Sequence, residues 1–330
     1  MRAIAIFLIA SLSGCATAHE DAPGGLASPT DEARPAATVA FTEGPTVDRE
    51  GTVYFSEMVT SRILKYTPPA LATDPAGRSR NPSRRLLSVL GGIETFRTES
   101  GGANGLIFDR QGRLIAAEGE ARRVTRTDLA TDAIEVLAEN HPGSPLDLPN
   151  DLTLDGRGRI YFTDYLGRRV YRIDPDGSVE QILGPDDVEA PNGIVISPDD
   201  RTLYHVEASQ REGGARNIRA YDLAEDGTVD NMRVFHDFHP GRSADGLAID
   251  REGNVYAAAG LNRTRGSSET LDTKAGIHVF APDGRKIGFH PIWEDTVTNC
   301  AFGGEDMKTL YVTAGKTLFA IRTEIAGTPR

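Results

Sequence analysis

The sequence predicts an all-β fold, a six-bladed β-propeller, from three observations. One motif recurs six times along the chain. Its copies begin roughly 40 to 60 residues apart, which is the length of one four-stranded propeller blade. No long stretch with the 3.6-residue hydrophobic period of a helix interrupts the copies. Six copies therefore indicate six blades around a central channel.

Each copy of the motif predicts a β-hairpin. In "PNDLTLDGRGRIYFTD", two segments of alternating hydrophobicity flank an Asp-x-x-Gly turn. The Asp side chain caps the turn, and the Gly takes a positive φ. The six copies are "TEGPTVDREGTVYFSE" from Thr42, "ANGLIFDRQGRLIAAE" from Ala103, "PNDLTLDGRGRIYFTD" from Pro149, "PNGIVISPDDRTLYHVE" from Pro191, "ADGLAIDREGNVYAAA" from Ala244 and "TNCAFGGEDMKTLYVTA" from Thr298.

The segments between the copies predict the outer strands of each blade. "RILKYT", "RRVYRID" and "GIHVFAPDG" alternate like half-buried strands. A propeller usually closes by pairing its N-terminal strand with its last blade, and a closed ring has no long exposed sheet edge. The candidates for closure are "ATVAF" (37–41) and "KTLFAIRTE" (316–324). We therefore place the propeller at residues 38–324, followed by a tail at 325–330.

The N-terminus has the pattern of a bacterial export signal. An arginine precedes a short apolar run, which is too short to span a bilayer. "LSGC" (12–15) resembles a lipobox, which implies cleavage before Cys15 and lipidation of its thiol; the alternative is an ordinary secretory peptide cut near "ATA". Because Ala16 rather than Asp follows Cys15, enteric sorting rules imply the outer membrane. We expect a signal peptide at 1–15, a flexible tether at 16–37 and a lipid-anchored, periplasmic protein of the bacterial cell envelope.

The composition argues against a nucleic-acid partner and against an intramolecular disulfide. The chain has 330 residues, 39% of them hydrophobic, and a formal net charge of -12. A nucleic-acid partner is not expected, because such a protein needs a basic face. Cys300 is the only cysteine besides Cys15, so a lipidated Cys15 leaves no intramolecular disulfide. Cys300 starts an apolar strand and is predicted to pack in the core; the oligomeric state is left open.

Each copy carries one polar residue at the same position, at the start of its first strand. These residues are Glu43, Asn104, Asn150, Asn192, Asp245 and Asn299. Equivalent positions of propeller blades form a ring around the channel, so six oxygen-bearing side chains should converge at one mouth. The alternative is that each residue only caps its strand, but the change of residue type among copies favours different roles. Hard oxygen ligands select Ca²⁺, with Mg²⁺ or Mn²⁺ as lesser options, whereas zinc normally recruits His or Cys.

Taken together and in this order, these motifs resemble the senescence marker protein/gluconolactonase/luciferin-regenerating enzyme family of six-bladed propellers. The segments "AAGLNR" and "TVTNCAFGG" are most similar to its bacterial gluconolactonase branch. The resemblance implies a sugar lactonase with one divalent cation in the channel, with Ca²⁺ expected and Mg²⁺, Mn²⁺ or Zn²⁺ as options. It implies that Glu43, Asn192 and Asp245 are metal ligands. Asn150 would be a ligand or a substrate contact, and Asn104 a substrate contact.

The side chains of this ring could supply the two groups that lactone hydrolysis requires, a bound cation and a base. The cation would polarise the lactone carbonyl, and a neighbouring carboxylate would take a proton from water. The resemblance implies that Asp245 is this base, although a bound cation weakens it as a base. Acidic residues also end the second strand of four copies, and they either select sugar hydroxyls or face water at the rim. These residues are Glu57, Glu118, Asp164 and Glu207. Of the four, Glu118 is taken as a substrate contact.

Two classes of function remain. The first is metal-dependent hydrolysis of a small-molecule sugar lactone to the aldonic acid, with other lactones, aryl esters or organophosphates as alternative substrates. The second is a non-catalytic propeller that binds a ligand. No Gly-x-Ser-x-Gly motif supports a serine hydrolase, and "AGKT" (314–317) lacks the first glycine of a phosphate-binding loop. Arg97 and Arg263 are either contacts for a polar substrate or solvated loop charges.

Overall fold

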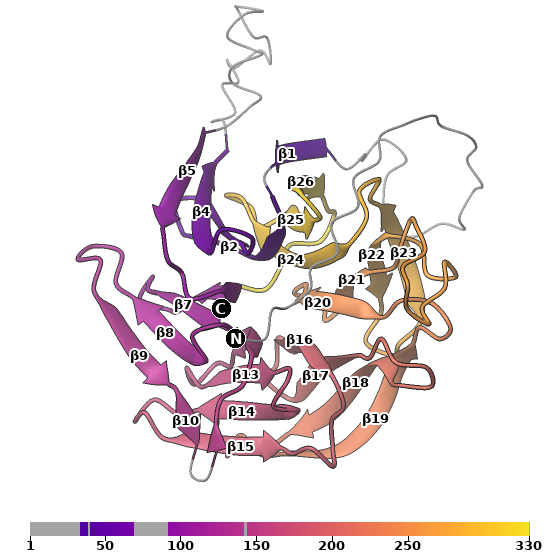
Figure 1. The fold of residues 1–330 in the computed structure, drawn as a ribbon, viewed down its shortest axis with the longest axis horizontal. Helices are drawn as coiled ribbons and strands as arrows, with labels where there is room; N and C mark the ends of the chain where they lie inside the picture. The colour runs from indigo at the N-terminus through magenta and orange to yellow at the C-terminus, as the bar shows by residue number, and fades with distance from the viewer. Residues whose placement is uncertain (1–33, 39, 69–91, 142–143, 330) are drawn as a thin grey trace, which may run out of the picture.

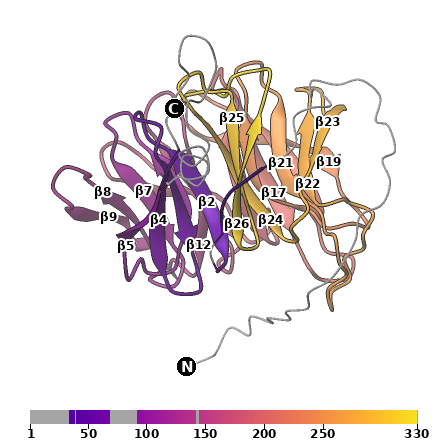
Figure 2. The same ribbon diagram turned by 90° about the horizontal axis from the view of Figure 1, so that it is seen from above.

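The structure is a computed structural model that describes residues 34–38, 40–68, 92–141 and 144–329. It confirms the predicted fold: six four-stranded antiparallel sheets form a ring (Figure 1). Turned by 90°, the ring shows its strands running along the channel axis (Figure 2). The predicted signal peptide, Cys15 and most of the predicted tether lie outside the described residues. No helix in the described part of the chain has the length and hydrophobicity needed to cross a bilayer.

Each sheet contributes its first strand to the wall of the channel, and the later strands lie progressively outward. Blade 6 differs, because its outermost strand comes from the N-terminus. A separate two-stranded hairpin, β10 with β11, lies between blades 2 and 3 in the sequence. The strands are β2 (Thr42–Val47), β3 (Val53–Glu57), β4 (Arg62–Thr67) and β5 (Gly92–Arg97) in blade 1; β6 (Ala103–Phe108), β7 (Leu114–Glu118), β8 (Arg123–Thr127) and β9 (Ile134–Ala138) in blade 2; β10 (Asn140–His141) and β11 (Ser144–Pro145); β12 (Pro149–Leu154), β13 (Ile160–Asp164), β14 (Arg169–Ile173) and β15 (Val179–Leu183) in blade 3; β16 (Pro191–Ile196), β17 (Thr202–Ala208), β18 (Arg216–Leu223) and β19 (Val229–Asp237) in blade 4; β20 (Ala244–Ile249), β21 (Val255–Ala259), β22 (Gly276–Phe280) and β23 (Lys286–Pro291) in blade 5; β24 (Val297–Gly303), β25 (Thr309–Ala314), β26 (Thr317–Arg322) and β1 (Arg34–Thr38) in blade 6.

The ring closes through β1, which pairs antiparallel with β26 from Arg34 opposite Ala320 to Thr38 opposite Thr317. In Figure 1 the indigo β1 lies beside the yellow β26. The expected closure is therefore present, but the strand begins at Arg34, inside the segment expected to be a tether. The reason is that β26 offers a free edge along its length, and backbone pairing there does not depend on side-chain hydrophobicity.

The predicted tail also makes backbone contacts. The amide of Gly327 donates to Met307 O at 2.8 Å, and the amide of Thr328 donates to Ile249 O at 3.3 Å. An isolated bridge pairs Gly327 with Asp250. The last residues therefore cross from blade 6 to blade 5 instead of leaving the propeller.

The Asp-x-x-Gly turns have the predicted chemistry. In blade 2 the backbone amide of Gly112 donates to Asp109 O at 2.9 Å, and Gly112 has a φ of +77°. The Asp109 carboxylate accepts the amide of Arg113 at 2.9 Å. The hairpins of blades 1, 2, 3 and 5 are thus closed by an aspartate and a glycine. In blade 4 the amide of Asp200 donates to Ser197 O instead, and in blade 6 the amide of Met307 donates to Gly304 O.

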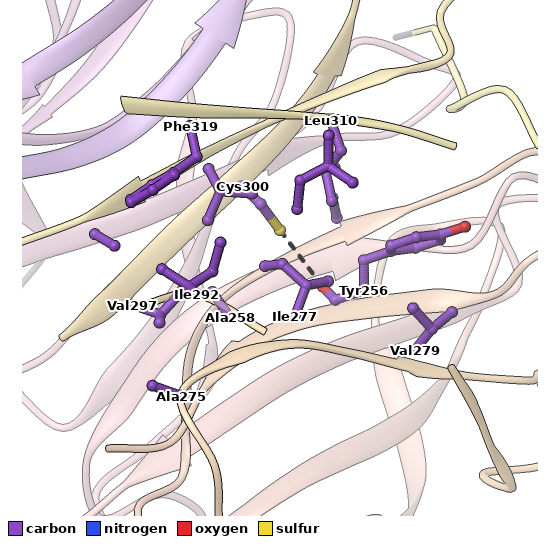
Figure 3. Close-up of a cluster of buried hydrophobic side chains, with 14 of the residues drawn as sticks. Tyr256, Ala258, Ala275, Ile277, Val279, Ile292, Val297, Cys300, Leu310 and Phe319 are labelled. Atoms are coloured by element: carbon purple, nitrogen blue, oxygen red, sulfur yellow. Dashed lines mark hydrogen bonds between the residues drawn. The ribbon is translucent and has the colours of Figure 1, made fainter. Parts of the chain in front are cut away.

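The hydrophobic core is divided among neighbouring sheets. Figure 3 shows the cluster between blades 5 and 6, where Ile277 and Val279 of β22 meet Leu310 and Phe319 of blade 6. Cys300 lies in this cluster, is 3% exposed and directs its sulfur toward Tyr256 O at 3.6 Å. Its predicted packing role is confirmed, because it is surrounded by apolar side chains and burial raises the pKa of its thiol.

Candidate active site

A β-bulge lies at the start of each of the six inner strands. The bulge occurs in the pairing between the first two strands of a blade, at or beside its polar key residue. Bulges redirect side chains and are common next to active sites. The register shifts lie between Glu43 and Thr46, Ala103 and Leu106, Pro149 and Leu152, Pro191 and Ile194, Ala244 and Leu247, and Val297 and Asn299.

Small residues beside the key positions let neighbouring inner strands approach closely. A Cβ on Gly44 would lie 2.0 Å from Asn104 O, and Gly44 has a φ of +39°. A Cβ on Gly246 would lie 2.1 Å from the side-chain amide of Asn299. In blade 3 the equivalent position holds Asp151 instead of glycine. The ring is therefore narrow, and one extra carboxylate enters it.

Three carboxylates lie close together in the ring, those of Glu43, Asp151 and Asp245. Burial and the charges of Asp245 and Asp151 raise the pKa of Glu43 well above its usual range. Burial raises the pKa of Asp151 to about 7, although the amide of Leu152 and the Asn299 side chain oppose the shift. Such a group of buried acids carries more negative charge than its surroundings readily accept.

One guanidinium partly neutralises this group. Arg242 donates one hydrogen bond to Asp245 Oδ2 and another to Val297 O at 3.0 Å. Burial raises the pKa of Asp245, whereas Arg242 and a hydrogen bond from Asn192 lower it. Arg242 is only 7% exposed, so it belongs to the wall of the site and not to the rim.

The asparagine side chains predicted to lie in the ring have different environments. Asn299 donates its Nδ2 to Asp151 Oδ2 at 3.2 Å, and its Oδ1 accepts the amide of Cys300 at 2.8 Å. Asn192 contacts Asp245. Asn150 is partly exposed and Asn104 is buried. Among the described residues neither of these two side chains has a hydrogen-bond partner, so both amides are available to a ligand.

The donor set fits a hard divalent cation. Among the described residues, no three His, Cys, Asp or Glu side chains come together in the arrangement of a metal site. An ion here would depend on Glu43 and Asp245 together with amide oxygens. Burial raises the pKa of both carboxylates, and the charge of Asp245 raises that of Glu43 further. Carboxylate and amide oxygens are the ligands that Ca²⁺ prefers.

The acidic residues that end the second strands have other partners. All four, Glu57, Glu118, Asp164 and Glu207, are fully buried. Asp164 accepts the backbone amides of Asp147 at 3.0 Å and Leu148 at 2.6 Å. Glu207 accepts the amide of Ala190 at 2.7 Å. Asp164 and Glu207 thus hold the loops that lead into the first strands of their own blades.

Glu118, expected as a substrate contact, has hydrogen-bond partners in the protein for both of its oxygens. One of its oxygens accepts from Arg97 and from Thr125 Oγ1 at 2.6 Å, and the other accepts from Arg123 at 2.7 Å. Both oxygens thus have partners, from Arg123 and Thr125 in blade 2 and from Arg97, which ends β5 of blade 1. Of the long insert at 67–100, residues 69–91 lie outside the described part of the chain.

Sequence reasoning missed three residues of the site, Asp151, Arg242 and Tyr165. Burial, then Asp245 and Glu269, raise the pKa of Tyr165, so its phenol lies near the same mouth. Asp151 could have been found as the one acid among the small residues that follow the key positions. Nothing in the sequence pattern distinguishes Arg242 from the many surface arginines.

The channel is also hollow on the far side of the ring. A cavity of about 770 Å³ extends from Gly44 and Asp151 past Val195 to Phe302 and Pro329. Its walls combine apolar side chains of the inner strands with charged residues of the hairpin turns, such as Asp48 and Arg113, and the C-terminal segment borders its end.

Comparison with known proteins places these features in one family. A model of the SMP-30/gluconolactonase/LRE-like region matches residues 41–316. A gluconolactonase of Zymomonas mobilis is 26% identical over 323 residues, which cover 88% of this chain and 81% of that one.

Solved structures agree with this placement. A gluconolactonase of Xanthomonas campestris is 25% identical, has a TM-score of 0.72 and covers 91% of both chains. A regucalcin of Agrobacterium tumefaciens, described as a calcium-binding protein, has a TM-score of 0.66 at 19% identity and covers 89% of this chain and 93% of its own. At that identity the regucalcin shows the shared fold alone.

Proposed function

The chain belongs to the SMP-30/gluconolactonase/LRE-like family, and from that premise we propose that it hydrolyses a sugar lactone to the aldonic acid with one divalent cation, Ca²⁺, in its channel. Lactonase activity in general follows from the relatives, which are gluconolactonases. The observation that carries the finer proposal is the buried ring, in which the carboxylates of Glu43 and Asp245 lie among amide side chains and the charge of Asp245 raises the pKa of Glu43.

Glu43, Asn150, Asn192 and Asp245 would hold the cation. When bound, it supplies Lewis-acid stabilisation of the negative charge that develops on the carbonyl oxygen. Zn²⁺ would serve less well, because the ring offers only oxygen donors and no His or Cys side chain. Mg²⁺ and Mn²⁺ also take oxygen ligands and are the lesser options.

The chain's own residues account for orientation and proton transfer. Asp245 takes a proton from the attacking water, whose oxygen bonds to the carbonyl carbon. The ring C–O bond breaks, and the ring oxygen receives a proton, so one water is consumed and one hydroxy acid forms. Arg242 holds Asp245 in place through Oδ2. Asn104 orients the lactone through its free amide.

The test is acid release from D-glucono-1,5-lactone by the purified full chain, with Ca²⁺ and after chelation, less the spontaneous rate. We expect release that depends on the cation. Activity that survives complete chelation would remove the cation from the proposal. No release with any divalent ion would overturn sugar-lactone hydrolysis and favour an aryl ester, a larger lactone or a ligand-binding role.

We further propose that the chain is anchored at the bacterial outer membrane by a lipid on Cys15. The support is the "LSGC" sequence at 12–15 and the alanine that follows it. Cys15→Ser should move the protein from the membrane fraction to the soluble periplasmic fraction. Unchanged membrane association of that variant would overturn the anchor.

A further inference from the structure

Arg265 is a partly buried cation with no ion pair among the described residues. It lies in the loop between β21 and β22, and its guanidinium donates one hydrogen bond, to the hydroxyl of Thr296. A hydroxyl does not neutralise a guanidinium. Carboxylates act on Arg265 from a distance, but none in the described part of the chain pairs with it directly, and a guanidinium that is partly removed from water gains from a directly bound anion.

The loop that carries Arg265 is fixed by contacts at both ends and in between. Leu261 and Lys274 form a bridge across its base, and Thr270 bridges to Gly241. Asn262 donates its Nδ2 to Ile292 O at 3.0 Å. The loop therefore holds Arg265 beside the strand entry of blade 6 and does not leave it free in solvent.

Arg265 also faces a second guanidinium. Burial lowers the pKa of Arg265 and the charge of Arg242 lowers it further, whereas Asp295, Glu269 and Asp245 act in the opposite direction. Arg242 has Asp245 as its one carboxylate partner in the described part of the chain. The two guanidiniums donate to neighbouring residues, Arg242 to Val297 O at 3.0 Å and Arg265 to the hydroxyl of Thr296, so both lie at the strand entry of blade 6.

We propose that this mouth selects sugar lactones that carry an acidic group, such as a carboxylate, at the end remote from the reacting carbonyl, with Arg265 and Arg242 binding that group. The inference rests on the proposed lactonase function and names its substrate class. Guanidinium groups bind carboxylate and similar anions through paired hydrogen bonds. Binding at a remote group also orients the reacting end of a substrate. The chain carries a net charge of -12, so an anionic substrate requires such a local cationic contact.

Two lactones that differ only at this group provide the test. D-Glucaro-1,4-lactone carries a free carboxylate at C6, where D-glucono-1,4-lactone carries a hydroxymethyl group. We expect Arg265→Gln to lower kcat/KM for the glucarolactone about 10- to 100-fold, the range for a hydrogen bond to a charged group. The gluconolactone should change by less than about 3-fold. Arg263→Gln, on the same loop but exposed, should change neither, and Arg265→Lys should retain part of the activity.

A binding measurement tests the anion site independently of lactonase activity. Calorimetry in EDTA with the two product acids should show D-glucarate binding more tightly than D-gluconate, with the difference lost in Arg265→Gln. If the gluconolactone is hydrolysed but Arg265→Gln affects both lactones equally or neither, the inference is overturned and the lactonase stands. If neither lactone is hydrolysed, the lactonase proposal fails. Glucarate binding that depends on Arg265 then still supports the anion site, and its absence overturns that site too.

Discussion

The single carboxylate of Asp245 is proposed both to bind the cation and to act as the general base. It lies in the ring with Glu43, receives a hydrogen bond from Asn192 and pairs with Arg242. Asp245→Asn keeps the volume of the side chain but removes the charge that a base and a cation ligand both need. We expect kcat/KM for gluconolactone to fall about 100- to 10,000-fold, the range for loss of a general base.

A matched variant distinguishes loss of chemistry from loss of folding. Asp306→Asn removes an aspartate that is also paired with an arginine, Arg322, but at an exposed position. We expect this variant to keep full activity, and both variants to unfold cooperatively. Near-normal turnover by a folded Asp245→Asn protein would eliminate Asp245 from the mechanism.

Glu118 is expected to stabilise blade 2 without binding substrate. Its two oxygens accept from Arg97, Arg123 and Thr125 in a fully buried position. Glu118→Gln leaves Arg97 buried without a counter-charge, which should lower the free energy of unfolding by about 3 kcal/mol. Urea denaturation measures this loss.

The same variant tests the sequence-based expectation for this residue. If Glu118 only supports the blade, KM for gluconolactone in the folded Glu118→Gln protein should be unchanged. A large rise in KM with little loss of stability would restore it as a substrate contact. Glu135→Gln, which removes an exposed partner of Arg126, should leave both stability and KM unchanged.

The residue types within the repeat predicted most side chains of the ring, but not the arginine that pairs with one of them. Glu43, Asn192 and Asp245 stand at equivalent positions, so their convergence follows from the repeat itself. Arg242 lies outside the repeat, and its contact with Asp245 depends on the path of the loop between β19 and β20. A single sequence carries no signal for such a path.

At the scale of elements, the hairpins were predictable and the bulges were not. Alternating hydrophobicity and the Asp-x-x-Gly turn define both strands of each hairpin locally. The bulge beside Glu43 or Asn150 depends on how closely the next inner strand approaches, as at Gly44 against Asn104. That approach is a property of the assembled ring and not of one hairpin.

Strand β22 contains a histidine that should make the stability of blade 5 depend on pH. His278 is 5% exposed and packs against Phe238 and Phe289, and burial and Lys286 lower its pKa to about 3. An unfolded histidine has a pKa near 6.5, so between these values the unfolded state binds more protons. Stability should therefore fall as pH drops below about 6.5, by about 2 kcal/mol at pH 5 relative to pH 7.5.

Denaturation in urea at several pH values measures how the free energy of unfolding changes with pH. His278→Gln should flatten the pH dependence by about that amount, because glutamine does not titrate in this range. The control is His239→Gln, which removes an exposed histidine beside Asp237 and should leave the slope unchanged. An identical slope in the His278 variant would contradict the assignment.

At the scale of the whole molecule, the ring is held closed by one short strand. The spacing of the repeats predicted the number of blades, and the requirement for closure predicted that the two ends of the chain meet. The exact closing residues were misplaced by a few positions, because β1 pairs through its backbone and any extended segment of suitable length can fill that edge.

Removal of this strand should weaken the entire propeller and not only blade 6. Deleting residues 1–38 removes the ladder between β1 and β26, at roughly 1 kcal/mol per hydrogen bond, so we expect a loss of about 2 to 5 kcal/mol in the free energy of unfolding. It also exposes the edge of β26, which favours association between molecules. A chain that starts at Arg34 keeps β1 and serves as the control. Equal melting temperatures and equal monomer content for the two chains would show that β26 and its neighbours close the ring without β1.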